Sequence, residues 1–282
     1  MLGRRLFLAR LLGVGAGALA GPAWARSRFV FAVVPYLPAR RLVSLYAPLV
    51  PLFERVLGKP VEISSAPDYG QHLQRLRAGD YDIVADSLII ARIAEREHGY
   101  IPVARTKSPL EPLLVVPVGA TIQNLAGLAG GTIAVTDRTA ALSVIGLHHL
   151  RERGLVLGRD FRVLVSGSHA NSLHRLLAGE ASAAIVSRTT LKQVDAALAQ
   201  RVRVLDPLST GLSAVVYHIA PRLAHYAAPL ERALIEFANQ QAEGRAFVEA
   251  LGHEALLPVR AEEMKALDPL VIEFYRQTGE RD

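Results

Sequence analysis

One sixteen-residue pattern occurs twice in this chain, and it constrains the fold more than any other feature of the sequence. Residues 72–87, HLQRLRAGDYDIVADS, align without a gap on residues 172–187, SLHRLLAGEASAAIVS. The Leu, Arg, Leu, Ala-Gly and closing Ser positions coincide, and Asp80 aligns with Glu180. Each copy continues into a helical run and a further apolar strand, IPVA in the first and VRVL in the second. We therefore predict duplicated β-α-β-α-β halves, which fold into two α/β lobes.

The second copy and its flank, residues 163–187, predict a strand, a polar turn, a helix, another turn and a final strand. Leucines at 173, 176 and 177 give this helix one apolar stripe. Asn171 or Ser172 can cap the start of the helix, and Gly179 can end it. Residues 183–186 form a continuous apolar run, which is typical of a strand buried on both faces.

Both copies end in a serine, Ser87 in the first and Ser187 in the second. In open parallel sheets, ligands bind beyond the carboxyl ends of the strands. We therefore place Ser87 and Ser187 at facing edges of a cleft between the lobes. A serine directly before a helix is also a common N-cap, so a capping role and a ligand role are both open.

The first 25 residues have the pattern of an export signal. Basic residues precede a mildly apolar core, a Gly-Pro pair breaks the core, and Ala23-Trp24-Ala25 fits an A-x-A cleavage site. The run RRLFL at 4–8 is similar to a twin-arginine signal, which exports folded proteins. An uncleaved anchor is the alternative, but the core at 11–20 is short and glycine-rich for a bilayer span of ~20 residues. We expect cleavage near Ala25 and a protein located in the periplasm.

Composition and charge exclude several classes of protein. The chain has no cysteine, so disulfides, thiol nucleophiles and a lipid-bearing cysteine are excluded. Three of its 32 basic residues lie in the signal segment, which leaves 29 basic against 26 acidic residues, a net charge of +3. These charges are interspersed along the chain, so we expect no nucleic-acid partner.

No catalytic or metal-binding constellation stands out in the sequence. His148 and His149 are neighbours in a predicted helix, where adjacent side chains point apart. Asp80 and Asp82 flank a predicted turn, and the chain has no nucleophile elbow, phosphate loop or HExxH motif. We therefore predict no enzymatic activity, no cofactor and no metal.

Proline-containing breaks predict where the chain passes from one lobe to the other, near 108–118 and 205–215. Residues 26–112 and 213–282 then form lobe 1, and residues 113–212 form lobe 2. The pattern after residue 219 is helical, so these C-terminal helices are expected to pack back on lobe 1. The predicted fold class is α/β, with a mixed, mostly parallel sheet flanked by helices in each lobe.

The order of motifs along the chain resembles that of a known family. It runs from a first strand and PYLP through a helix, GKPVEI, a tyrosine, a helix and AGDYD to LAGGTIAVTD, SGSH and LAGEASAAIV. This order is similar to that of periplasmic solute-binding proteins, most closely the branch that binds phosphonate, phosphate and phosphite. The resemblance implies a type II periplasmic-binding-protein fold, with two hinge strands and a ligand in the interlobe cleft. It also implies delivery of the solute to an ABC importer, although some relatives serve sensor kinases.

The resemblance further implies which residues contact the ligand. The cleft tyrosine of the family corresponds to Tyr36, and its cleft histidine corresponds to His169. The oxyanion-binding turn corresponds to residues 136–143, at a helix start that offers unpaired N–H donors. The family's run of Ser and Thr is interrupted here by Ala140-Ala141-Leu142. The candidate ligand-binding residues are Tyr36, Ser87, Thr136, Thr139, Ser143, His169 and Ser187.

Each candidate has a structural alternative. Tyr36 could pack its ring on its own loop, and His169 could be a turn histidine satisfied by backbone groups. Asp137 is expected to shape the turn, which leaves Thr139 as the better donor. Arg138 and Arg188 could supply positive charge to the cleft or lie in solvent.

The function predicted from these features is a monomeric, exported binding protein that closes on a small oxyanion and works with an ABC permease. The alternative is a ligand-binding accessory of a periplasmic sensor kinase. An enzyme on the same fold is a third reading, but the export signal and the missing catalytic constellation argue against it.

Overall fold

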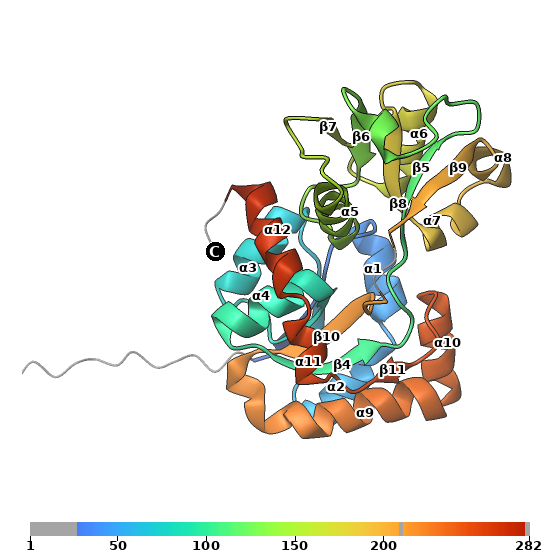
Figure 1. Ribbon diagram of the computed structural model, residues 1–282. Helices are drawn as coiled ribbons and strands as arrows, with labels where there is room; N and C mark the ends of the chain where they lie inside the picture. Colours follow the sequence, from blue (N-terminus) through green and yellow to red (C-terminus); the bar gives the residue numbers. More distant parts are fainter. Residues whose placement is uncertain (1–26, 209–210, 280–282) are drawn as a thin grey trace, which may run out of the picture.

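The computed structural model describes residues 27–208 and 211–279, so the predicted signal segment lies outside the described residues (Figure 1). The described chain forms two mixed sheets, each flanked by helices, which confirms the predicted fold class. We call the first sheet and its helices lobe 1, and the second sheet and its helices lobe 2. Within the described ranges, no helix combines the length and the apolar character needed to span a bilayer.

The sheet of lobe 1 has the strand order β11-β4-β10-β3-β1-β2. Its strands are β1 (Phe29–Val33), β2 (Val61–Ser64), β3 (Ile83–Ser87), β4 (Ile101–Thr106), β10 (Val215–Ile219) and β11 (Leu256–Leu257). β1 pairs with β2 and β3 in parallel, whereas β10 lies antiparallel between β3 and β4. The two-residue strand β11 was not predicted, because it is too short to show an alternating pattern.

The sheet of lobe 2 has the strand order β7-β6-β8-β5-β9. Its strands are β5 (Pro112–Pro117), β6 (Thr132–Val135), β7 (Arg162–Val165), β8 (Ala183–Ser187) and β9 (Val202–Pro207). β6 pairs with β7 and β8 in parallel, and β5 lies antiparallel between β8 and β9. This order matches that of β2-β1-β3-β10-β4 in lobe 1 strand for strand. The antiparallel strand inside each sheet, β10 in lobe 1 and β5 in lobe 2, is the first strand that follows a crossing of the chain from the other lobe.

The repeat is reproduced down to single hydrogen bonds. α3 (Tyr69–Arg77) and α6 (His169–Leu177) are capped by Asp68 and Ser168. Each capping side chain accepts a hydrogen bond from the backbone N–H three residues later, that of Gln71 and of Asn171. Both helices end at a glycine with positive φ, at 72° for Gly79 and 79° for Gly179, a conformation that glycine adopts at little cost. The duplicated β-α-β-α-β organisation predicted from the sequence is therefore present in the fold.

The residue predicted to cap the helix of the second copy was wrong. Ser168 caps α6, three to four residues before the expected Asn171 or Ser172. The apolar stripe that guided the prediction begins at Leu173, but the first turn of the helix lies before it and carries polar residues. Asn171 instead donates its own N–H to the Ser168 Oγ.

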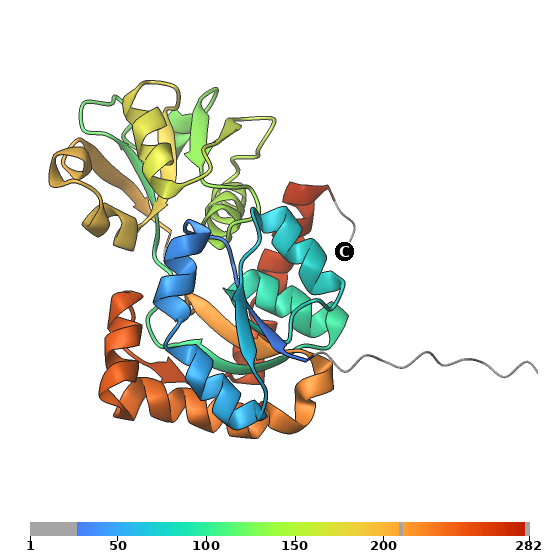
Figure 2. The ribbon, with the colours of Figure 1, turned by 180° about the vertical axis from the view of Figure 1, so that it is seen from behind.

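Helices cover both faces of the lobe 1 sheet. α1 (Ala39–Tyr46), α2 (Leu49–Leu57), α9 (Ala227–Gln240) and α10 (Ala242–Ala250) share one apolar cluster with the sheet. α3, α4 (Leu88–His98), α11 (Ala261–Lys265) and α12 (Asp268–Thr278) share the cluster on the opposite face. Figure 2 shows α1 and α2 in front of the sheet and α9 along its base. The C-terminal helices thus pack on lobe 1, and α1 and α2 are separate helices.

Lobe 2 is built in the same way around its smaller sheet. α5 (Ala141–Glu152) packs on one face, with Leu142, Leu147 and Leu150 against the strands. α6 packs on the other face through Leu173 and Leu176, beside the short helices α7 (Arg188–Gln193) and α8 (Ala196–Ala199). Two 3-10 segments, Leu125–Leu128 in lobe 2 and Pro221–Tyr226 in lobe 1, complete the described secondary structure.

Candidate functional site

The predicted ligand-binding residues all follow the carboxyl ends of strands. Tyr36 comes after β1 and Ser87 ends β3 in lobe 1, whereas the other five belong to lobe 2. Thr136 and Thr139 lie in the turn after β6, and Ser143 lies in the first turn of α5. His169 is the first residue of α6, which follows β7, and Ser187 ends β8. The edge at which parallel strands end is the usual ligand edge of an open α/β sheet.

Thr136 and His169 are joined directly, across the ends of β6 and β7. The Oγ1 atom of Thr136 lies 2.7 Å from Nδ1 of His169. Burial lowers the pKa of His169 to about 4, so the imidazole is neutral near pH 7. In the tautomer whose Nδ1 accepts from the Thr136 hydroxyl, Nε2 carries the proton and can donate to a ligand.

The turn after β6 is shaped by Asp137. One carboxylate oxygen accepts from the Thr139 N–H at 2.8 Å and from the Thr139 Oγ1 at 2.6 Å. The structural role predicted for Asp137 is therefore confirmed. The hydroxyl proton of Thr139 is engaged by this carboxylate, so in this conformation the Thr139 hydroxyl is not the free donor that the sequence suggested.

The start of α5 offers backbone rather than side-chain donors. Its N-cap is Ala140, which makes no side-chain cap hydrogen bond. Ala140, Ala141 and Leu142 are buried, as is Ser143. The first N–H groups of a helix have no acceptor within the helix, and they lie at the positive end of its dipole. The arrangement can therefore favour an anion through main-chain groups alone.

Two tyrosines of lobe 1 lie at the junction with this turn. The hydroxyl of Tyr36 is 3.5 Å from that of Tyr46 on α1, and burial raises the pKa of Tyr36. Tyr69 is the first residue of α3, and its pKa is raised by burial and further by the negative charge of Asp137. Because Asp137 belongs to lobe 2, Tyr69 lies near the junction of the lobes, and it shares an apolar cluster with Ala140 and Ala141 of lobe 2.

Tyr69 was missed among the candidate residues, although the sequence carries a signal for it. The offset of 100 positions that relates the repeats pairs Tyr69 with His169, and each is the first residue of its helix. Applying the repeat to His169 would have placed Tyr69 at the corresponding edge of lobe 1.

Ser87 acts as a helix cap, one of its two predicted roles. Its hydroxyl accepts from the Ile90 N–H at 3.5 Å at the start of α4, and the residue is buried. In the sheets, Ser87 pairs with Val215 and Ser187 pairs with Pro112. Both serines therefore lie beside the strand by which the chain enters their own sheet from the other lobe.

A buried charged cluster holds the end of β3 in place. Asp86 lies between His72 of α3 and His218 of β10, with Nε2–Oδ2 distances of 3.0 and 3.5 Å, and all three side chains have zero exposure. Burial alone would raise the pKa of Asp86, but the charges and hydrogen bonds of the two histidines outweigh it and lower the pKa to about 2. Asp86 also accepts from the Ser87 N–H at 2.8 Å, which fixes the edge of the sheet where α4 begins.

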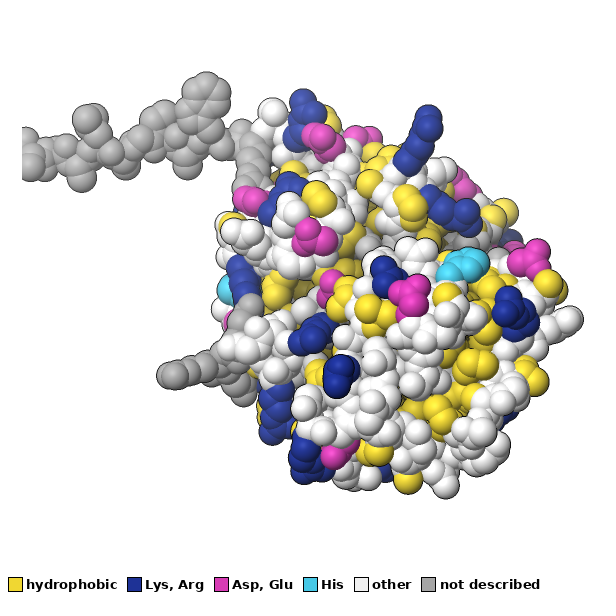
Figure 3. All heavy atoms as spheres, turned by 90° about the horizontal axis from the view of Figure 1, so that it is seen from above, with side chains coloured by type: hydrophobic (Ala, Val, Ile, Leu, Met, Phe, Trp, Pro, Cys, Tyr) yellow, Lys and Arg dark blue, Asp and Glu magenta, His cyan; other side chains and the backbone are white. Residues whose placement is uncertain are grey.

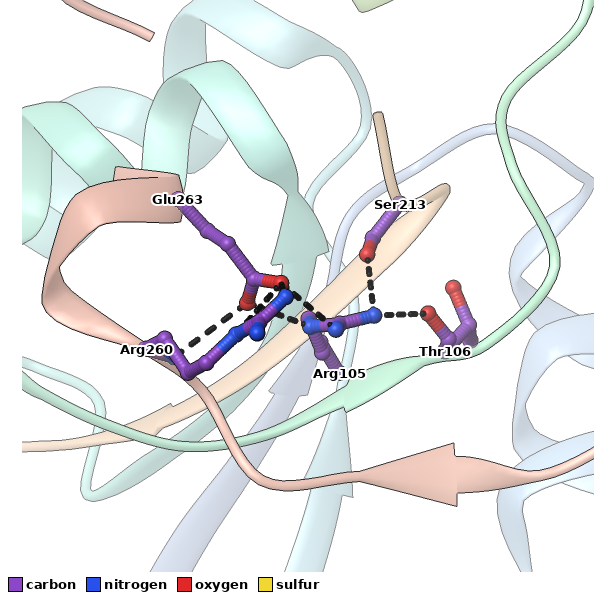
Figure 4. A network of polar contacts seen from close by, with 5 residues as sticks. All are labelled: Arg105, Thr106, Ser213, Arg260 and Glu263. Carbon is purple, nitrogen blue, oxygen red and sulfur yellow. Dashed lines mark hydrogen bonds and ion pairs between the residues drawn. The ribbon is translucent and has the colours of Figure 1, made fainter. Parts of the chain in front are cut away.

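A cavity of about 760 Å³ opens beside the chain crossing, and none of the predicted residues lines it, although Leu88 directly follows Ser87. Leu88, Leu212, Val216, Met264 and Leu267 form its apolar wall. On its polar side, Arg105 donates to both carboxylate oxygens of Glu263 at 2.7 Å and to the Ser213 Oγ at 3.2 Å (Figure 4). Arg105 is thus paired with a carboxylate of the cavity wall, and Arg260, which also lines the cavity, is bonded to the same Glu263. Across residues 27–208 and 211–279, no group of three His, Asp or Glu residues is arranged to hold a metal ion.

The fold and the junction together define a class of protein. Two α/β lobes are joined by two chain crossings, and polar groups follow the carboxyl ends of strands in both lobes, which is the construction of a two-lobed ligand-binding protein. A family model described as the periplasmic phosphonate substrate-binding protein of an ABC transporter matches residues 31–264, and the chain belongs to this family. The family is one of substrate-binding transport proteins rather than enzymes, and its fold is the type II periplasmic-binding-protein fold.

Solved structures share the fold at low sequence identity. A binding-protein component of an ABC phosphonate transporter from Pseudomonas aeruginosa is 17% identical, with a TM-score of 0.74, over 89% of this chain and 87% of that chain. A Xanthomonas citri protein bound to chloride is 19% identical, with a TM-score of 0.74, over 90% of this chain and 99% of its own. PhnD1 from Prochlorococcus marinus, in complex with methylphosphonate, is 12% identical, with a TM-score of 0.74 and coverages of 90% and 99%. No curated protein matches the chain.

Proposed function

We propose that this protein is the substrate-binding component of an ABC importer and that it binds a small oxyanion of the phosphonate, phosphite or phosphate class between its lobes. The observation that carries the proposal is the contact between Thr136 and His169 at 2.7 Å, because it orients a neutral imidazole at the edge where the parallel strands of lobe 2 end. Family membership supplies the ligand class, and the methylphosphonate complex of PhnD1 is an example of it.

The proposed site recognises the anion through neutral donors. Nε2 of His169 donates from lobe 2, and the first N–H groups of α5 add main-chain donors at the positive end of the helix dipole. Tyr36 and Tyr69 close the site from lobe 1. The Asp137 carboxylate shapes the turn, and its negative charge makes the site unfavourable for ligands that carry a full double charge close to it.

The buried Ala140-Ala141-Leu142 run determines how the anion can be held. In this chain, the positions at the start of α5 supply methyl and isobutyl groups instead of hydroxyls. The ligand is then bound by main-chain N–H groups at this end, which recognise the shape of a tetrahedral oxyanion without distinguishing its substituent. Discrimination among phosphate, phosphite and alkylphosphonates would therefore come from the lobe 1 side of the site, where two aromatic rings lie.

The route to the periplasm and the partners are part of the same proposal. The predicted signal at residues 1–25, with its twin-arginine pattern, would export the folded chain as a monomer. The partner is the permease of the importer, which receives the liganded, closed form. The family match does not favour the sensor-kinase alternative.

Calorimetry on the mature chain tests the proposal. We expect one saturable site for at least one of phosphate, phosphite and methylphosphonate, and loss of binding in His169→Ala. His174→Ala is the matched control, because His174 lies on the same helix and is exposed. Absence of heat with all three anions would refute the oxyanion part of the proposal, and equal affinity of the His169→Ala variant would refute the assigned site.

A further inference from the structure

The first two turns of α5 are buried around their whole circumference, so this helix is covered on more than one side. All residues from Ala140 to Leu147 are buried, although they face in every direction around the helix axis. Leu142, Leu147 and Leu150 belong to the apolar core of lobe 2, together with strand residues such as Ile133 and Ile185. This accounts for only one face of the helix.

The other face of α5 is covered by lobe 1. Ala140, Ala141, Val144 and Ile145 belong to the same apolar cluster as Leu267, Val271 and Phe274 of the α12 region. α5 and α12 are in direct contact. Figure 1 shows α12 beside α5 at the level where the two lobes meet, and the view from behind agrees (Figure 2). The C-terminal helix of lobe 1 is therefore packed against a helix of lobe 2.

A charged contact crosses the junction at the far end of α5. The guanidinium of Arg151 forms an ion pair with Glu273 of α12, which is only 2% exposed. His148 of α5 is also 4.0 Å from the same carboxylate, while Arg276 approaches it from within α12 at 3.8 Å. A buried carboxylate that loses its partner keeps the cost of desolvation without the compensating attraction. Moving α5 away from α12 is thus opposed by both the apolar seam and this ion pair.

We infer that this arrangement of the lobes is the closed one and that the contact between α5 and α12 is an interlobe latch that stabilises it. The Arg151–Glu273 ion pair of the latch lies at the opposite end of α5 from the proposed ligand-binding residues. A ligand that touches both lobes binds only the closed form, so its apparent affinity scales with the closed fraction of the molecules. The Arg151–Glu273 ion pair would therefore raise the affinity of the site without contacting the ligand.

Small-angle X-ray scattering on the ligand-free mature chain tests the latch independently of any ligand. The variant Arg151→Met removes the cation that crosses from lobe 2, and Arg276→Met is the matched control, because it removes a cation that approaches Glu273 from the same helix. We expect Arg151→Met to raise the radius of gyration by roughly 0.5–1 Å above the ~18 Å of a compact chain of this length, and Arg276→Met to leave it unchanged.

Glu273→Gln serves as the second variant, since it keeps the size of the side chain while removing its charge. We expect the same expansion as for Arg151→Met. Should Glu273→Gln fail to fold by circular dichroism, Arg151→Met decides alone, because its side chain is partly exposed. A folded Arg151→Met variant with the radius of gyration of the parent chain would overturn the inference, whatever the result of the ligand titrations.

Discussion

The Oγ1 of Thr136 and the Nδ1 of His169 lie 2.7 Å apart, although 33 residues separate them in the chain. The first residue follows β6 and the second begins α6, so this bond joins two neighbouring strand ends into one rigid edge. It also determines which imidazole nitrogen is left for a ligand. The chemistry of the proposed site follows from this pair.

His169 is expected to remain neutral throughout the physiological range. Burial lowers its pKa to about 4, below the ~6.5 of an unfolded chain. Between these values the unfolded state binds a proton that the folded state does not, so His169 makes the fold less stable as the pH falls from about 6.5 towards 4. Nuclear magnetic resonance should show that the chemical shifts of the His169 imidazole protons do not change with pH above about pH 5. A midpoint near 6.5 would contradict the buried, Thr136-bound arrangement.

Asp86→Asn is expected to destabilise the protein strongly. The substitution removes the buried carboxylate that lies 3.0 Å from His72 and 3.5 Å from His218, and a buried polar group left without its partner costs about 1–3 kcal/mol. Urea unfolding at pH 7 measures the loss, and Asp80→Asn serves as the control, because Asp80 is partly exposed in a turn and should cost less than about 1 kcal/mol. Equal stabilities of the two variants would argue against the cluster.

The same cluster predicts an acid limit of stability. The pKa of Asp86 is depressed to about 2, so its contribution is fully present above the unfolded value of ~3.9 and is lost as the pH falls towards 2. The parent chain should therefore lose stability more steeply below pH 4 than Asp86→Asn does. Parallel acid-unfolding curves for the two proteins would speak against this assignment.

Gly244→Ala is expected to disturb the packing of α10 on α9. A Cβ atom at this position would lie 1.8 Å from the backbone oxygen of Phe237, which cannot move without shifting the helix. Overpacking of this kind costs about 1–3 kcal/mol or more. Gly119→Ala is the control, because nothing lies within 4 Å of its added Cβ. Thermal unfolding should show a lowered midpoint only for Gly244→Ala.

Tyr69→Phe is expected to weaken binding of the oxyanion without unfolding the chain. If the Tyr69 hydroxyl faces the ligand, its loss removes one hydrogen bond and lowers affinity by roughly three- to tenfold. Tyr226→Phe is the matched control in lobe 1, where the hydroxyl is bonded to the Leu57 carbonyl instead. Calorimetry with the best-bound anion distinguishes the two variants, and an unchanged affinity for Tyr69→Phe would exclude its hydroxyl from the site.

Local patterns in the sequence predicted the architecture because the fold repeats itself. The Ala-Gly turns, the capped helices and the apolar runs of the two copies recur at a fixed offset, so each supports the other. Ser168 was not predicted as the N-cap of α6, because a cap lies before the apolar stripe from which a helix is recognised in a sequence. The strand β11 was not predicted, because a strand of two residues, Leu256 and Leu257, is too short to show a periodic pattern.

Long-range contacts could not be derived in the same way. The pairing of His72 and His218 with Asp86 joins segments up to 146 positions apart, and nothing local marks these residues as partners. The packing of α12 on α5 is a long-range contact of the same kind. The sequence of α5 can indicate that the helix is buried, but it does not indicate which element covers it. Figure 3, which looks down on lobe 2, shows basic and acidic side chains interspersed on that face, as the sequence indicated.

The most direct measurement of the central claim is a crystal structure of the mature chain with the anion that binds best in calorimetry. We expect the anion between the two lobes, with one oxygen within hydrogen-bonding distance of the His169 Nε2 and another facing the first N–H groups of α5. An anion bound instead beside Arg105 in the cavity at the chain crossing, or on the outer surface of one lobe, would contradict the account.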